Sequence, residues 1–179
     1  RAEQSVLALL DGVERMLVEV AALELRSAPG ADAARRKILG EAETLLRELA
    51  SREGDRPEIR RALARTALRR ASLLLEQDRL AEAESALAEV ERARAALRPE
   101  DLSARELLAF DGEALALKAQ LARTRGDAET SLAFLAEALS KSEALLELDA
   151  RDRDAWGRLA RRCGEAGTSA GLLRRFDQA

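Results

Sequence analysis

Residues 104–148 read ARELLAFDGEALALKAQLARTRGDAETSLAFLAEALSKSEALLEL. Ser103 precedes this stretch, and Glu106 follows three residues later, which is the spacing of a capping box at a helix start. Gly126-Asp127 interrupts the stretch with the composition of a tight turn. Apolar side chains recur every three or four residues on both sides of that turn, as on one face of a helix. The stretch therefore predicts two antiparallel helices, one from the Ser103 cap to about Arg125 and one from Ala128 to Leu148.

Helical periodicity runs through the rest of the chain, and short turns divide it into segments. Pro29-Gly30 and Gly54 are typical helix stops, whereas Pro57 suits a first helical turn, where its missing N–H would have no partner. No segment shows the alternation that a half-buried strand requires. The sequence predicts an all-α fold with further helices over residues 2–26, 32–52, 58–77, 80–97 and 154–166, and a short final helix after Gly167. The inward face expected of residues 32–52 comprises Ile38, Ala42, Leu45, Leu46 and Leu49.

The turns recur at similar distances along the chain. Gly126 follows the tight turn at Asp78 by 48 residues, and Gly167 follows Gly126 by 41. A period of this length in helix pairs indicates a solenoid-like array, because each pair can bury its apolar face only against the next. We therefore expect one domain over residues 1–179 with seven to eight helices, built from pairs at residues 1–53, 57–98, 101–148 and 153–179.

Composition limits the classes of function. Apolar residues make up 47% of the chain but aromatic residues only 2%, so alanine and leucine must fill the core. A net charge of −3 does not suggest a nucleic-acid-binding protein. Cys163 is the only cysteine and favours a reducing, cytoplasmic setting. No stretch approaches the roughly 20 apolar residues that span a bilayer. Because the chain begins with Arg1, we expect a fragment of a longer protein.

The late segment of the chain resembles the tetratricopeptide repeat family. Trp156, Leu159, Ala160 and Gly167 match the spacing of that repeat, and Cys163 stands where the family has tyrosine. The resemblance implies helix pairs stacked as a right-handed superhelix that binds proteins or peptides. It also implies that Trp156, the only tryptophan, lies in the core; the alternative is an exposed aromatic anchor for a partner. Two earlier segments resemble further repeats: Gly126-Asp127 with Ser131, Leu135 and Ala138, and Asp78 with Ala83, Leu87 and Val90.

A looser resemblance links residues 29–167 to the repeat region that follows the kinase domain in some bacterial serine/threonine kinases. It rests on the alanine-, leucine- and arginine-rich sequence around residues 45–57 and on residues 143–149, which precede Asp154-Ala155-Trp156. This resemblance implies a docking or sensory arm of a larger bacterial signalling protein. The chain itself contains no kinase motif.

Catalysis is not expected of this chain. Nucleophilic catalysis by serine or cysteine usually needs a neighbouring base, most often histidine, and the chain has none. Cys163 is therefore predicted to be a small buried apolar residue rather than a reactive thiol. Gly112, which lies alone inside a helical pattern, suggests close helix packing or a local bend. We expect no catalytic residue, no metal ligand and no cofactor.

One charged pattern is a candidate binding surface. Arg61, Arg65 and Arg69 repeat every four residues, where like charges repel unless acidic neighbours compensate. The stripe either pairs with carboxylates of adjacent helices or forms a docking strip for an acidic peptide or phosphate group. In the resembled family, the first helix of each pair lines the groove. That implies further partner-contacting positions at Arg65, Leu68, Ser72, Glu113, Gln120, Arg123, Asp154 and Arg161.

Three hypotheses of function follow. The first is a non-catalytic module that binds a protein or peptide, with an acidic partner favoured by the arginine stripe. The second is a sensor domain in which a small ligand enters the groove. The third is self-association, as a homodimer, through the broad apolar face of residues 2–26. Binding to a membrane or to nucleic acid is not expected.

Overall fold

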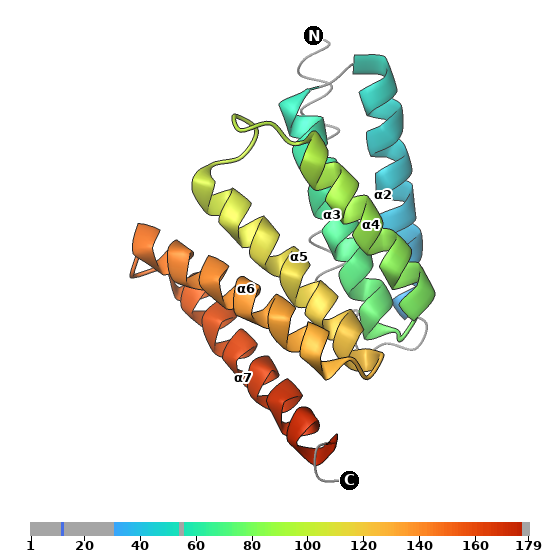
Figure 1. Ribbon diagram of the computed structural model, residues 1–179. Helices are drawn as coiled ribbons and strands as arrows, with labels where there is room; N and C mark the ends of the chain where they lie inside the picture. Colours follow the sequence, from blue (N-terminus) through green and yellow to red (C-terminus); the bar gives the residue numbers. More distant parts are fainter. Residues whose placement is uncertain (1–11, 13–30, 54–55, 177–179) are drawn as a thin grey trace. The chain divides into compact units, whose positions relative to one another are not determined.

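The computed structural model describes residues 12, 31–53 and 56–176, and these residues form helices and no strand (Figure 1). This confirms the all-α prediction for the described residues. The helix expected over residues 2–26 lies outside them, and so does part of the expected count of seven to eight. The described helices are α2 (Ala31–Glu53), α3 (Pro57–Glu76), α4 (Leu80–Ala96), α5 (Ala104–Thr124), α6 (Ala128–Leu148) and α7 (Arg153–Phe176).

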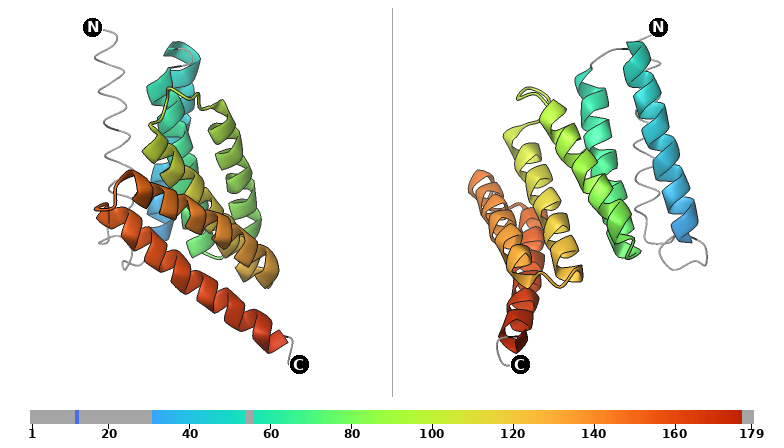
Figure 2. Two further views of the ribbon diagram at one scale, coloured as in Figure 1. Left: turned by 60° about the vertical axis from the view of Figure 1, so that its left-hand side comes forward. Right: turned by 45° about the vertical axis from the view of Figure 1, so that its right-hand side comes forward.

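The chain divides into two compact units, residues 1–101 and residues 102–179. The first contains α2, α3 and α4, and the second contains α5, α6 and α7. Within each unit, consecutive helices run antiparallel and lie side by side (Figures 1 and 2). Short connections allow this arrangement because they leave a helix no route except back along its predecessor.

Two equivalent turns join α3 to α4 and α5 to α6. Asp78 and Gly126 both adopt positive φ, of 54° and 83°. In each turn the next N–H reaches back to the helix, from Arg79 to the Leu74 carbonyl and from Asp127 to the Ala122 carbonyl, both at 3.0 Å. These are Schellman motifs, which favour glycine and tolerate aspartate at the left-handed position. The equivalence of the two turns predicted from the sequence is therefore confirmed.

The turn predicted at Gly167 is wrong, because α7 continues through this residue to Phe176. Among the described glycines only Gly126 has a positive φ, so Gly167 keeps a helical backbone. Its neighbours favour continuation. Thr168 donates its hydroxyl to the Gly164 carbonyl at 3.0 Å, and the buried Ser169 hydroxyl lies 3.2 Å from that of Ser131 on α6. Packing against α6 thus carries the helix past a residue of low helix propensity.

In the first unit, α2 and α3 share an aliphatic core that includes Leu39, Leu46, Ile59 and Leu73. The inward face predicted for α2 is partly wrong, because Leu45 is 41% exposed and Leu39 is buried in its stead. α4 also packs against α3, and its buried residues are two alanines and two larger aliphatic residues: Ala83, Ala86, Leu87 and Val90.

The segment that ends the first unit is fixed by a buried ion pair. Arg60 on α3 donates from Nε and Nη2 to the two carboxylate oxygens of Asp101, each at 2.7 Å. The Arg98 N–H donates to the same carboxylate at 2.8 Å. Both side chains are almost fully buried. The hydrogen bond from Arg60 lowers the pKa of Asp101 to about 2, so this carboxylate is charged at neutral pH.

The capping box predicted at Ser103 is confirmed and gives a direct test of the start of α5. The Glu106 N–H donates to Ser103 Oγ at 3.2 Å, and the Ser103 N–H donates to Glu106 Oε2 at 3.0 Å. We expect Ser103→Ala to lower the free energy of unfolding by about 1 kcal/mol, because one helix N–H loses its partner. Urea denaturation followed by circular dichroism measures this. Ser103→Asp, which keeps an acceptor at the cap, should recover most of the loss.

In the second unit, a buried arginine ties the three helices together. Arg162 of α7 is 4% exposed, and its Nη1 donates to the Ala138 carbonyl of α6 at 2.7 Å and to the Ser142 hydroxyl. A Cβ on Gly112 of α5 would lie 2.8 Å from the same Nη1. Only glycine leaves room for the guanidinium there, which confirms the close packing suggested by the sequence at Gly112. Burial lowers the pKa of Arg162, but an arginine stays protonated in proteins.

Candidate interaction surface

The arginine stripe on α3 is only partly solvent-exposed. Arg65 and Arg69 are exposed, whereas Arg61 is half-buried, with its Nη2 3.6 Å from the carboxylate of Glu58 on the same helix. Arg69 forms no ion pair with any described residue. The stripe is therefore exposed at two of its three predicted positions.

Nearby arginines outside the stripe pair with acidic side chains of neighbouring helices. Arg70 on α3 donates to Glu43 of α2 and Glu89 of α4, each at 3.0 Å. Arg47 of α2 contacts the same two carboxylates. Carboxylates of adjacent helices thus neutralise the charge of Arg70, the residue that directly follows Arg69 of the predicted stripe.

The other predicted groove residues lie at different depths. Leu68 is buried at 5% exposure, so it is a core residue and not a contact residue. The remaining positions fall on three helices and in two units. Ser72 on α3 and Glu113, Gln120 and Arg123 on α5 are half-buried, and Asp154 and Arg161 are exposed on α7. Of these, Asp154 and Arg161 are the two that share one exposed helix surface.

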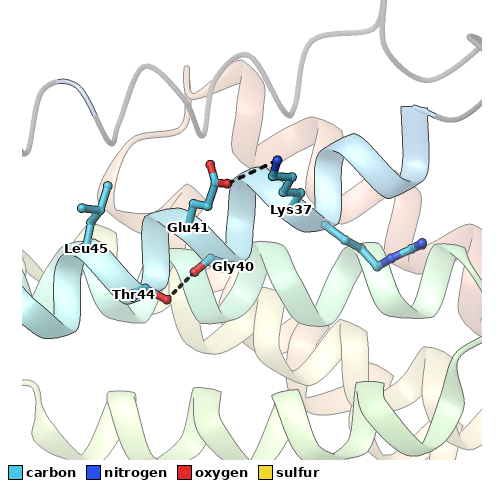
Figure 3. A pocket seen from close by; sticks show the side chains of 6 residues that line it. Lys37, Gly40, Glu41, Thr44 and Leu45 are labelled. Atoms are coloured by element: carbon cyan, nitrogen blue, oxygen red, sulfur yellow. Dashed lines mark hydrogen bonds and ion pairs between the residues drawn. The ribbon is translucent and has the colours of Figure 1, made fainter.

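A shallow hollow lies along the surface of α2 (Figure 3). All of its lining residues come from this helix, and two pairs of them interact with one another, whereas Arg36 donates to Gln77 of α3. Thr44 donates to the Gly40 carbonyl at 2.9 Å, and Lys37 Nζ lies 3.8 Å from the Glu41 carboxylate. No polar side chain from a second described helix lines this hollow, so it lacks the converging groups of a small-molecule site. Its lining residues are Arg36, Lys37, Gly40, Glu41, Thr44 and Leu45.

Two predictions of burial on α7 are wrong. Trp156, expected in the core, is 53% exposed, and Cys163, expected to be a buried apolar residue, is also exposed. The cause is the rotation of α7 about its axis. Ala155, Arg162 and Ser169 are buried, and they recur every seven residues along one side of α7, which does not include Trp156. The guanidinium of Arg162 needs the space over Gly112, and this requirement sets which side of α7 faces inward.

Asp152 fixes the first turn of α7. Its Oδ1 accepts hydrogen bonds from the N–H groups of Asp154 and Ala155 at 2.9 and 3.0 Å, and its Oδ2 accepts one from Arg105 of α5 at 2.7 Å. The hydrogen bond from the Ala155 N–H is the main cause that lowers the pKa of Asp152. A charged cap at a helix N-terminus is favourable. The Asp152 cap therefore holds the first turn of α7, and the buried Arg162 holds the helix further along, against α6.

The result is an exposed tryptophan in a fixed orientation. The indole Nε1 of Trp156 donates to the Ala150 carbonyl at 3.0 Å, which ties the ring to the turn between α6 and α7. Leu148, the last residue of α6, is 57% exposed. Apart from Arg153 at its N-terminal end, the rest of this side of α7 is made of small exposed residues. We call it the Trp156 face, and it consists of Trp156, Gly157, Ala160, Gly164 and Gly167.

Positive charge flanks the Trp156 face. The helix α7 carries six arginines against one aspartate and one glutamate, in a chain whose net charge is −3. Arg153 and Arg161 are exposed and form no ion pair with any described residue. Asp154 is the one exposed carboxylate on the described part of this helix. The exposed charged residues at the Trp156 face are therefore two arginines, Arg153 in line with the small residues and Arg161 beside them, and one aspartate, Asp154.

Sequence reasoning missed Arg162, Asp101 and Asp152, the polar residues that position these elements. Asp152 carried a usable signal, because aspartate is a preferred N-cap and its carboxylate there accepts from the N–H groups two and three residues later. Asp101 and Arg162 carried no local signal, since each depends on a partner about 20 to 40 residues away in the chain.

The described residues include no group of three histidine, cysteine, aspartate or glutamate side chains that could hold a metal ion. None of the described helices is both long and apolar enough to cross a membrane. Comparison of the chain with protein-family models, with curated proteins and with solved structures found no match.

The exposure of Trp156 can be tested directly, because it is the only tryptophan and the chain has no tyrosine. We expect Trp156→Ala to change the free energy of unfolding by about 0.5 kcal/mol, against the 3–5 kcal/mol typical of a buried tryptophan. Fluorescence of the unaltered chain should show emission at long wavelength and efficient quenching by acrylamide. A loss of several kcal/mol, or weak quenching, would mean that the indole is part of the core.

Proposed function

We propose that this chain is a non-catalytic helical module that binds a protein or peptide through the Trp156 face. The observation that carries the proposal is the 53% exposure of an indole whose orientation is fixed by a hydrogen bond to the Ala150 carbonyl. Exposing a tryptophan leaves a large apolar area in water, and tryptophan is among the residues that dominate binding energy at protein interfaces. A fixed ring loses little conformational entropy when a partner covers it.

Two further features support a repeat architecture for the module. The turns at Asp78 and Gly126 have the same backbone hydrogen bonding, 48 residues apart. In addition, an arginine in the first turn of α3 and of α5 binds an aspartate that precedes α5 and α7 respectively, as Arg60–Asp101 and Arg105–Asp152. We therefore propose helix pairs stacked in the manner of tetratricopeptide repeats, as a right-handed superhelix.

The parent protein belongs to the same proposal. The resemblance to the region that follows the kinase domain of some bacterial serine/threonine kinases supports a role as the docking arm of a cytoplasmic signalling protein. A docking arm needs rigid helices and an accessible anchor, and α7 with Trp156 offers both.

Photo-crosslinking at the Trp156 face tests the proposed function. A photoreactive p-benzoylphenylalanine replaces Ala160, an exposed residue one helical turn from Trp156, in cells that produce the chain. We expect adducts with another polypeptide that weaken several-fold when Trp156→Ala is added. The matched control carries p-benzoylphenylalanine in place of Ala136, which is exposed on α6.

Three outcomes would count against the proposal. Adducts no stronger at Ala160 than at Ala136 would remove the evidence for a binding face. Adducts that are insensitive to Trp156→Ala would mean that the indole is not the anchor. An adduct with twice the mass of the chain would replace partner binding with self-association.

A further inference from the structure

We infer that the Trp156 face docks an amphipathic α-helix with acidic flanks, contributed by the partner protein. This inference rests on the proposed function, since it names the chemistry of the partner at the same face. Three observations carry it: the exposed indole of Trp156, the exposed arginines near it, and the row of small residues along α7.

The glycines of α7 have no function within the chain that the structure reveals. A Cβ added at Gly157, Gly164 or Gly167 would meet no atom within 4 Å, and none of the three has a positive φ. Gly112 shows the contrast, because its missing Cβ makes room for Arg162. Glycine is among the poorest helix formers, so three of them in an exposed stretch of α7 weaken the helix without helping it to pack internally.

A partner helix explains where these glycines lie. Gly157, Ala160, Gly164 and Gly167 follow one another at spacings of three, four and three residues, which places them along one side of α7. Because none has a side chain larger than a methyl group, a second helix can approach until the two backbones are almost in contact. Trp156, at the N-terminal end of this row, then provides the large apolar surface that a helix of only small residues lacks.

The charge distribution selects an acidic partner. Arg153 lies at the N-terminal end of the row and Arg161 lies beside it. Both lack an ion pair among the described residues, whereas other described arginines such as Arg70 and Arg105 are paired. Asp154 neutralises only part of this positive charge. Glutamate or aspartate side chains at the edges of an incoming helix would pair with the free guanidinium groups and orient the helix along α7.

Two synthetic peptides test the inference with the full chain. Both are fluorescein-labelled amphipathic helices of 21 residues with leucine on one side, and the flanking positions carry glutamate in one peptide and lysine in the other. We expect the glutamate peptide to bind, as measured by fluorescence anisotropy, and to shift the emission of Trp156 to shorter wavelength. The lysine peptide should bind at least about tenfold more weakly, because the charge pairing is reversed.

Variants of the chain separate charge from shape. The double variant Arg153→Glu with Arg161→Glu should weaken the glutamate peptide about tenfold, since two favourable charge pairs become repulsive. Arg69→Glu is the matched control, because this arginine is also exposed and unpaired but lies on α3. It should change the affinity less than about twofold.

Gly164→Leu tests the close approach of the two helices. The leucine side chain has open space within the chain, so the helix content and the unfolding midpoint should be kept or raised. Binding of the glutamate peptide should nevertheless fall by about tenfold or more, because the side chain occupies the path of the partner helix.

Equal binding of both peptides, or undiminished binding to the Gly164→Leu chain, would overturn the inference. The inference would also be overturned if a single-stranded oligonucleotide, at the same concentration as the glutamate peptide, displaced that peptide, because this would indicate a nucleic-acid site. The crosslinks formed at residue 160 do not depend on these peptides. If the peptides fail while Trp156-dependent crosslinks persist, the proposed function stands and only the acidic helix is wrong.

Discussion

Replacing Gly112 with leucine is expected to destabilise the second unit by about 3–5 kcal/mol, the sum of overpacking and of lost hydrogen bonds to a charged group. The first carbon of the new side chain would already lie 2.8 Å from Nη1 and 3.0 Å from Nη2 of Arg162. The guanidinium cannot move aside without leaving the Ala138 carbonyl and the Ser142 hydroxyl. A guanidinium that moved would be a buried cation without its acceptors. If it did not move, the leucine would force α7 away from its place against α6.

Gly164→Leu is the matched control for this substitution. It makes the same chemical change in a helix of the same unit, but it adds its side chain where no atom lies within 4 Å. We expect it to raise the free energy of unfolding by up to about 1 kcal/mol, because leucine is a better helix former than glycine. Urea denaturation of both variants measures the difference. Similar effects at the two positions would show that the space over Gly112 is not needed for Arg162.

Arg60→Met is expected to cost the first unit about 3–5 kcal/mol, since breaking a buried ion pair on one side leaves the other charge without its partner. Asp101 would lose both hydrogen bonds from the guanidinium and keep the one from the Arg98 N–H. Methionine has a comparable length, so the loss reports on the charge more than on packing. Arg69→Met, at an exposed position of the same helix, should change stability by no more than about 0.5 kcal/mol.

The pH dependence of this effect distinguishes a lost ion pair from a lost packing contact. The folded pKa of Asp101 lies near 2, below its ordinary value of 3.8, so the pair contributes stability above about pH 4. That contribution is lost as the pH falls from about 4 to about 2, because the carboxylate becomes protonated. The difference in unfolding free energy between the unaltered chain and Arg60→Met should therefore narrow over this interval. A difference that stays constant from pH 7 to pH 2.5 would assign it to packing.

The sequence predicted most helix boundaries in the described residues because they depend on local interactions. The capping box at Ser103 and the glycine at Gly126 act within one turn of the helices that they begin or end. The α6 helix begins and ends at the residues predicted, and α3, α4 and α5 do so within a residue or two. Gly167 shows the limit of such signals, because Ser169, bonded to Ser131 of α6, continues the helix beyond it.

The candidate site could be predicted only in part. Arg161 and Asp154 were identified, and the structure brings both to the exposed surface of α7. The repeat resemblance assigned Trp156 to the core and left an exposed anchor as the alternative. The repeat spacing gives no information about the rotation of a helix about its axis. That rotation depends on Arg162, which looks like a surface residue in the sequence and is 4% exposed in the fold.

By itself the sequence determined that the described chain is helical, where its turns lie, and that it offers no histidine for catalysis. These properties follow from backbone propensities, caps and composition, which act over a few residues. The tertiary structure alone decided which side of α7 is buried and that Arg60 pairs with Asp101 in the core of the first unit. These features depend on contacts between residues that are about 40 to 50 positions apart. Trp156 is exposed because the distant contact of Arg162 over Gly112, and not the hydrophobicity of the indole, orients α7.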